Sequence, residues 1–378
     1  MQGELDRANE HLQRAQQLVK DRPASASKAR ILSEVARFHM VAGRHAEAVA
    51  VGQQAIVIAD ELGLEDIHAS ALITVGTARR NSGDPEGRSP IEEGLRIADR
   101  LNLPQVSFRA INNLSVSLVN DEGRLDRSSE LVEDGLRRCE RLGDRPQLTW
   151  FQSILAANRF WLGDFDDALR LVELVIDSAV PNYQTGNAHK LRARIRLARD
   201  DVAGAESDAE IAIALVRRIG EFQVVAPALA EASLVAAALG RESHALALVD
   251  ELIELDRPRP VRARSTTTGF YVPFALAAVE VGRASEFLEV TANVEHPSPW
   301  LTAGRAYARG ELGAAVELLS RLSVPDTAWA RLRAARALVD ENRRAEADAQ
   351  LHRALAFYRS VGATRYIREG EALLAATA

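Results

Sequence analysis

The hydrophobic pattern along the chain is helical and is interrupted at regular intervals. Between residues 46 and 59, small and apolar side chains recur every three or four positions, at Ala48, Val51, Ala55 and Ile58. This spacing is typical of one face of an α-helix. The segment 165–176 repeats the pattern. Residues 265–274 come closest to the alternation of a strand, but a lone strand would have no partner, so we predict a loop that runs into a helix.

Corner residues punctuate this pattern with a period of 40 residues. One series is Gly3, Gly43, Gly83, Gly123 and Gly163, followed less regularly by Asp200, Gly240, Gly282, Gly310 and Asn342. A second series, half a period away, is Gly63, Asn102, Gly143, Gly220 and Gly362. A small residue often lies five positions after a marker of the first series, with Arg88 and Phe287 as exceptions. Because Gly and Asn commonly end helices in the left-handed conformation, two corners per period predict two helices per repeat.

The repeat predicts an all-α fold, because one helix hairpin cannot bury its apolar face without a neighbour. We expect an α-solenoid, a right-handed superhelix of about nine antiparallel hairpins whose first helices line the concave face. A capping helix is expected over 364–376. The array should be regular over 1–256 and irregular over 257–378, with no independent domain. Gly3 is already a corner, which predicts either a piece of a longer polypeptide or a gene start placed inside one.

Several short motifs give the array a family likeness. They are the pair Val75 and Gly76, the pair Gly304 and Tyr307, and the turn from Gly163 to Ala168. With them the chain resembles the tetratricopeptide repeat (TPR) family, in the long-repeat form found in bacterial regulators. Those regulators include STAND-type signal-transduction ATPases, cyclase-linked ATPases and maltose-type transcription activators. The resemblance implies a binding module, with an effector domain (ATPase, cyclase or DNA-binding) expected N-terminal to this chain.

Composition narrows the classes of partner. The chain has 378 residues and a net charge of −6, so no overall positive field attracts nucleic acid or an anionic membrane. Apart from Lys20, Lys28 and Lys190 the basic residues are arginine, a bias that is poor support for phosphate binding. The apolar stretch 224–240 is shorter than a membrane span, and the first residues are too polar for a signal peptide. We therefore expect a cytoplasmic protein.

Catalytic signatures are weak throughout the sequence. It contains no phosphate-binding loop with Gly-Lys-Ser/Thr, no GxGxxG and no HExxH motif. The eight histidines are scattered, and no pair has the spacing of a helical zinc site. Cys139 is either a structural thiol or, beside Arg137, Arg138 and Arg141, a stabilised thiolate. The acidic turn at 164–167 is interpreted as a helix N-cap. We expect no enzyme activity, no cofactor and no metal, and assign no role to Cys139 or to the Arg- and Pro-rich segment 257–264.

The period also predicts which side chains line the concave groove. In hairpins of this kind these are first-helix positions about 13, 10, 6 and 3 before the corner. The polar and aromatic candidates selected by this rule are Arg37, Arg80, Asn113, Ser117, Asn120, Trp150, Phe160, Lys190 and Arg194. Arginine can bind carboxylates, asparagine can bond a peptide backbone and tryptophan supplies contact area. In the hairpins whose corners are Gly240 and Gly282 the same positions become apolar, for example at Leu234 and Leu276, through tighter packing or as a docking face for a missing domain.

The sequence determines the function of the chain less closely than it determines the fold. We expect a non-catalytic module that binds a protein, a peptide or a small acidic ligand in the groove, as the sensory or partner-binding region of a bacterial signalling or transcription regulator. One alternative is that the array closes on itself and the candidates are ordinary surface residues. A second is a free-standing scaffold or adaptor protein, and a third is an enzyme with its site in the groove.

Overall fold

The fold is all-α. A computed structural model describes residue 11 and residues 14–178, 183–257, 269–294 and 297–377. Over these ranges the chain forms α-helices joined by tight turns, with one 3₁₀ turn and no strand. The helices group into two compact units, residues 1–117 (unit 1) and 118–378 (unit 2), which are treated separately below. Gly3 and segment 258–264 lie outside the described residues.

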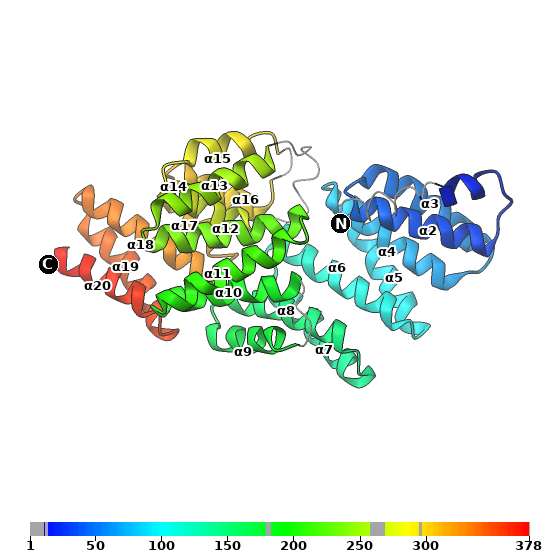
Figure 1. Cartoon of the computed structure of the whole chain (residues 1–378), viewed down its shortest axis with the longest axis horizontal. Helices are drawn as coiled ribbons and strands as arrows, with labels where there is room; N and C mark the ends of the chain where they lie inside the picture. The colour runs from blue at the N-terminus through cyan, green and yellow to red at the C-terminus, as the bar shows by residue number, and fades with distance from the viewer. Residues whose placement is uncertain (1–10, 12–13, 179–182, 258–268, 295–296, 378) are drawn as a thin grey trace. The chain divides into compact units, whose positions relative to one another are not determined.

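Unit 1 is a short stack of helix hairpins (Figure 1). Its elements are α2 (Ala26–Val41), α3 (His45–Glu61), α4 (Glu65–Asn81), the 3₁₀ turn η1 (Pro85–Gly87), α5 (Arg88–Arg100) and the first part of α6 (Pro104–Glu122). Helix α3 packs on α2 and on α4, α4 packs on α5, and the first helices α2 and α4 also pack on one another. This double pattern of contacts is that of a solenoid.

Unit 2 continues the alternation from the end of α6. Its regular helices are α7 (Leu125–Leu142), α8 (Arg145–Leu162), α9 (Phe165–Ile176), α10 (Tyr183–Ala198), α11 (Val202–Arg217), α12 (Phe222–Ala238) and α13 (Glu242–Asp256). Shorter helices follow: α14 (Tyr271–Glu280), α15 (Ala284–Thr291), α16 (Pro299–Ala308) and α17 (Leu312–Leu319). Full-length helices return with α18 (Val324–Asp340), α19 (Arg344–Ser360) and α20 (Thr364–Thr377). The predicted loop into a helix near 274 is confirmed where described, since α14 begins at Tyr271, and α20 is the expected terminal helix.

The predicted corners are confirmed at every described position. All markers of both series from Gly43 onwards have positive φ, and the described residues show positive φ nowhere else. Each first-series marker lies between the end of one helix and the start of the next, as Gly43 does between α2 and α3. The left-handed turn lets the chain reverse within a few residues. The helices therefore begin and end where the period places them.

Small residues after the corners bring paired helices together. Ala48, Ala168 and Ala347, five positions past their markers, are fully buried. Arg88 breaks the pattern because the adjacent Gly87 takes over its packing role. A Cβ on Gly76 would lie 2.5 Å from the Gly87 carbonyl oxygen, so α4 and η1 touch backbone to backbone. This close approach of the two backbones explains why position 76 is a glycine.

Unit 2 closes on itself. Its late helices pack against its early ones: α18 contacts α8, and α20 contacts α10. The indole nitrogen of Trp300 in α16 donates to the Val119 carbonyl oxygen at the end of α6, at 2.8 Å. A Cβ on Gly163 would meet Phe357 at 2.8 Å and Val324 at 3.2 Å, so the α8–α9 corner abuts α18 and α19. The inner face of unit 2 is therefore covered by its own C-terminal helices.

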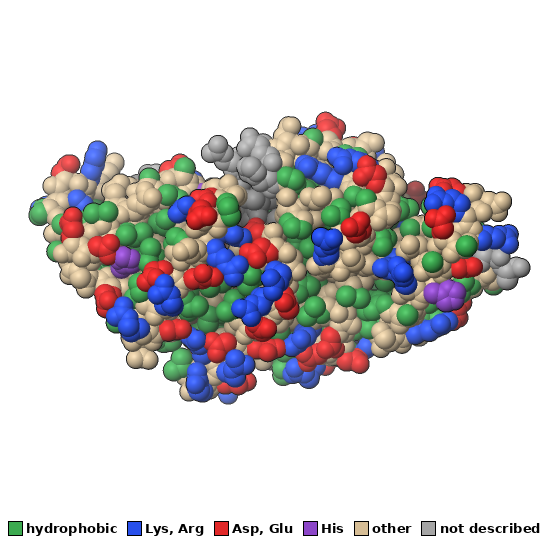
Figure 2. Space-filling model, turned by 180° about the vertical axis from the view of Figure 1, so that it is seen from behind, with side chains coloured by type: hydrophobic (Ala, Val, Ile, Leu, Met, Phe, Trp, Pro, Cys, Tyr) green, Lys and Arg blue, Asp and Glu red, His purple; other side chains and the backbone are tan. Residues whose placement is uncertain are grey.

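The surface carries charges of both signs. Figure 2 shows Lys and Arg side chains intermingled with Asp and Glu side chains over the face in view, as expected from the near balance of acidic and basic residues. Ion pairs such as Arg30 with Asp66 and Arg241 with Glu206 connect neighbouring hairpins. Over the described ranges, no helix has both the length and the apolar character needed to cross a bilayer.

Candidate functional site

Two rungs of hydrogen bonds join α4 and α6 on the inner face of unit 1. The Asn113 amide nitrogen donates to Thr77 Oγ1 at 2.8 Å. One turn earlier on α6, Arg109 Nη2 donates to the Ser70 carbonyl oxygen at 2.9 Å and to Ser70 Oγ at 2.8 Å. Residues four apart on a helix lie one above the other, so the two rungs share one face. We call Arg37, Ser70, Thr77, Arg109 and Asn113 the unit 1 inner face.

Arg109 is a largely desolvated cation in this face. Its Nη1 has Thr74 Oγ1 at 3.4 Å as a third neutral acceptor. Burial and the positive charge of Arg37 lower the pKa of Arg109 to about 10, while Glu34 acts in the opposite direction. The guanidinium is still charged at neutral pH. Arg109 thus gives the site a positive charge, whereas the oxygens that accept its hydrogen bonds are all neutral.

The predicted groove residues of unit 1 lie near this face. Arg37 is half-exposed and sits 3.7 Å from the Glu34 carboxylate. Asn113 and Ser117 on α6 are half-buried, as is Arg80 at the end of α4. Arg80 Nη1 reaches the Pro85 carbonyl oxygen at 3.4 Å. The structure therefore brings Arg37 and Asn113 onto a common face with Arg109.

The predicted residues of unit 2 have different surroundings. Asn120, Trp150 and Lys190 are half-buried, whereas Phe160 and Arg194 are buried. Burial lowers the pKa of Lys190, and Glu231 partly offsets this. The sequence places Phe160 and Arg194 on a solvent-facing groove, but the structure places them inside the unit.

A buried ion triad explains why Arg194 is inaccessible. Its guanidinium contacts Glu231 of α12 at 2.7 Å and Asp326 of α18 at 2.9 Å. Asp326 also accepts from Ser323 Oγ at 2.6 Å, and the Phe160 ring centroid lies 5.5 Å from the guanidinium carbon. The small cavity beside Arg194, enclosed by aromatic side chains such as Tyr358, has room for about one water molecule. Arg194 therefore joins α10, α12 and α18.

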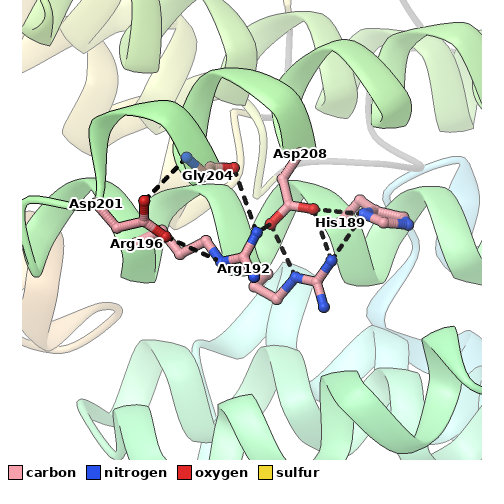
Figure 3. A network of polar contacts seen from close by, with 6 residues as sticks. All are labelled: His189, Arg192, Arg196, Asp201, Gly204 and Asp208. Atoms are coloured by element: carbon pink, nitrogen blue, oxygen red, sulfur yellow. Dashed lines mark hydrogen bonds and ion pairs between the residues drawn. The ribbon is translucent and has the colours of Figure 1, made fainter.

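A second polar network joins α10 to α11 (Figure 3). Asp208 is buried and accepts from His189 Nδ1 at 2.6 Å, from Arg192 at 2.8 Å through both oxygens, and from Arg196 at 2.8 Å. Burial alone would raise the pKa of Asp208, but hydrogen bonds from His189 and Arg192 and the charges of both arginines hold it at about 2. Every partner belongs to the same hairpin, so we assign this network to the packing of that hairpin.

Cys139 and the acidic turn behave as structural residues. Cys139 is buried, and burial with the charges of Asp144 and Glu140 raises the pKa of its thiol to about 12. This corrects the alternative that the thiolate is stabilised by nearby arginines. Asp164 accepts from the Asp167 backbone N–H at 3.2 Å, which confirms the N-cap. Among the described residues, no three His, Cys, Asp or Glu side chains are placed to hold a metal.

Sequence reasoning missed Arg109. The spacing rule used above to predict groove residues follows the direction of the backbone. It selects the neighbouring residue, Ala110, which is fully buried. An arginine side chain is long enough to reach inward from the flank of the face. A search one position either side of each predicted site for Arg could have found it.

Comparisons with known proteins add little. No family model matches the sequence, and no curated protein matches it closely enough to count as a relative. Among solved structures, a crystal structure of yeast Tom70 is 12% identical, covers 98% of this chain and 93% of that chain, and has a TM-score of 0.28. A circular tandem repeat protein with a novel repeat topology and enhanced subunit contact surfaces is 16% identical, covers 97% and 92%, and has a TM-score of 0.20. Such low scores carry no argument about function.

Proposed function

We propose that the chain is a non-catalytic binding module whose unit 1 inner face takes an extended peptide segment of a partner or a small acidic ligand. One observation carries the proposal. Ser70, Thr77, Arg109 and Asn113 form a polar row that is only half-buried, with Arg37 more exposed beside it. In unit 2 the predicted groove residues Phe160 and Arg194 are buried by other parts of the same unit. Unit 1 therefore keeps accessible the face that unit 2 fills.

The chemistry of Asn113 suits a peptide backbone. Its amide nitrogen gives one hydrogen to Thr77, and its oxygen accepts one bond from Asn112. A carboxamide has two N–H donors and two acceptor lone pairs, so one of each is left. A peptide unit offers the complementary acceptor and donor. The same residue can therefore hold α4 to α6 and bond an extended chain.

The regulatory role rests on the resemblance to long-repeat bacterial regulators. In a stack of hairpins each repeat contacts only its neighbours, so a ligand bound across α4 and α6 biases the angle between adjacent hairpins. We propose that this shift acts on an effector domain, ATPase, cyclase or DNA-binding, or on a partner protein. The module would then be the sensory or partner-binding region of a cytoplasmic regulator.

A peptide selection tests the proposal. Random 12-residue peptides displayed on phage are selected against the full chain, and the affinity of the best binder is measured by calorimetry. Asn113→Ala and Arg37→Ala are expected to weaken binding about tenfold, the equivalent of 1.4 kcal/mol each. Arg96→Ala is the control, because Arg96 lies exposed on the second helix α5 of the same unit. Unchanged affinity in both test variants would remove the unit 1 inner face as the site.

A further inference from the structure

The closure of unit 2 runs along one line of contacts. Successive corners of the early hairpins meet the late helices there. A Cβ on Gly163, at the α8–α9 corner, would lie 3.2 Å from the Val324 side chain, where α18 begins. Asp200, at the α10–α11 corner, pairs with Arg368 of α20 at 2.7 Å. We call the contacts between helices α8–α10 and helices α18–α20 the seam.

Charged side chains make many of the seam contacts. The Nη2 atom of Arg194 on α10 lies 2.9 Å from the carboxylate of Asp326 on α18, and both residues are buried. Arg365 of α20 lies 3.5 Å from the Asp200 carboxylate, and it donates to the Ala238 carbonyl oxygen. Two charges that leave water to form a buried pair lose much of their attraction to the cost of desolvation. These contacts therefore fix the position of α18–α20 more than they stabilise it.

The packing of the seam is also incomplete. A small cavity with room for about one water molecule lies between its two sides. Residues of both sides line it, including Phe160, Arg194, Ala198, Trp329, Tyr358 and Tyr366. The Tyr358 hydroxyl is buried and has no hydrogen-bond partner in the described chain, and a water in this largely aromatic cavity would have few polar partners. A void and a buried hydroxyl without a partner both lower the stability of an interface.

The stacked interfaces of unit 2 have a different character. Helix α13 packs on α12, and the buried residues of α13 are apolar except for Asp256. Helix α19 packs on α18 and on α20, and its buried residues are apolar except for Tyr358 at the seam. Apolar side chains gain free energy from burial and need no polar partner. The stack is therefore held more firmly than the seam.

From this contrast we infer that α18–α20 form a clasp that opens at the seam while the stack stays folded, and that the clasp gates the inner face of α8 and α10. Opening separates Asp326 from Arg194 and exposes the Phe160 ring, which is only 1% exposed when the clasp is closed. A ligand of this inner face binds the open form alone, so its apparent affinity falls in proportion to the open fraction. The clasp belongs to unit 2 and does not depend on peptide binding by unit 1.

Thiol labelling of the folded full chain tests the clasp. The buried Cys139 is replaced by serine, and Ala198→Cys then places one reporter in the lining of the cavity. Ala245→Cys on α13, in the same background, is the matched reporter for the stack, because both alanines are buried. A buried thiol reacts only when it is exposed, so its labelling rate in excess dithiobis(nitrobenzoate) follows the population of the opened form. We expect position 198 to label at least about tenfold faster than position 245.

Variants across the seam show whether this labelling reports the clasp. Asp326→Asn removes the charge that contacts Arg194, and should speed labelling at position 198 about tenfold while position 245 stays within about twofold. Arg365→Gln removes the contacts of that arginine and should speed labelling at position 198 about threefold. Arg359→Gln is the matched control, because the ion pair of Arg359 with Glu371 joins α19 to α20 without crossing the seam, and it should change neither rate.

Three results would overturn the clasp. Equal labelling at positions 198 and 245 before these changes, or a similar rise at both positions in Asp326→Asn, would mean that unit 2 opens only as a whole. Faster labelling at position 198 that responds to neither Asp326→Asn nor Arg365→Gln would mean local fraying at the end of α10. If Asp326→Asn does not fold, Arg365→Gln decides alone, because Arg365 is half-buried and its loss leaves the ion triad of Arg194 intact.

Discussion

At the scale of single residues, the buried charges of this chain show how polar groups are placed between helices. Asp208 is 1% exposed and is surrounded by His189, Arg192 and Arg196 from the preceding helix. A carboxylate this deep is tolerated because opposite charges and hydrogen-bond donors replace its water. Removing it would leave two guanidinium groups without their shared partner.

We predict that Asp208→Asn lowers the free energy of unfolding by about 3–5 kcal/mol, the usual cost of breaking a buried ion pair from one side. Asp166→Asn is the control, because Asp166 is 87% exposed in its pair with Arg199 and should change stability by less than about 1 kcal/mol. Urea unfolding followed by circular dichroism measures both. Similar values for the two variants would show that the network adds nothing to stability.

The surroundings of individual side chains were also the feature least predictable from the sequence. The period placed Arg37 and Asn113 on one face, because backbone direction follows from helical register. It missed Arg109, whose long side chain crosses from the flank. It also placed Phe160 and Arg194 on an open groove, since register alone does not show what later packs over a helix. How far a side chain extends, and whether another helix packs over it, depend on tertiary contacts. A repeat period carries no information about those contacts.

At the scale of helices, the corners were predictable because they are local. Each depends on a residue that adopts positive φ, and Gly, Asn and Asp do so at low cost. Asn102, Asp200 and Asn342 take this conformation in the structure as the glycines do. The shortened helices α14–α17 match the irregular spacing after Gly240, although their individual bounds depend on packing.

Gly76 gives a prediction at this scale. A Cβ there would lie 2.5 Å from the Gly87 carbonyl oxygen and 2.6 Å from Ile91, so Gly76→Ala must push α4 and α5 apart. We expect a loss of about 1–3 kcal/mol despite the better helix propensity of alanine. At Gly313 in α17 an added Cβ meets no atom within 4 Å, so Gly313→Ala should be neutral or stabilise by up to about 1 kcal/mol. Thermal unfolding of both variants checks the contrast, and a neutral Gly76→Ala would refute the close approach.

At the scale of the whole molecule, the two units use the same hairpins differently. Unit 2 closes through contacts between residues far apart in sequence, such as Arg194 with Asp326 and Trp300 with Val119. A repeat period describes neighbours only, so the sequence predicted the stack and left closure as one alternative among several. The apolar positions Leu234 and Leu276 are buried within unit 2, which fits the tight-packing alternative.

The units should also differ in their response to mild acid. In unit 1, burial lowers the pKa of His39 and of His45 below 6.5; Arg44 adds to the effect at His39, and Glu47 opposes it at both. The unfolded chain therefore binds protons at these sites before the folded one does. Their contribution to stability is complete above pH 6.5 and is lost as pH falls through the lower folded pKa values. In unit 2, Asp208, with a pKa of about 2, loses its contribution only below its unfolded value of 3.8.

Hydrogen exchange at pH 7.5 and 5.5, corrected for intrinsic rates, checks this prediction. Peptides from α2 and α3 should lose protection at the lower pH, whereas peptides from α16 and α17, which contain no histidine, should not. His45→Leu should reduce the loss in α2 and α3. Equal protection of α2 and α3 at the two pH values would contradict the prediction.

The binding face itself can be located by one measurement. Amide hydrogen exchange of the full chain is compared with and without a saturating 12-residue peptide selected for binding. We predict slower exchange in α2, α4 and residues 104–117 of α6, with the outer helices α3 and α5 little changed. Slower exchange confined to unit 2, or to α3 and α5, would contradict it.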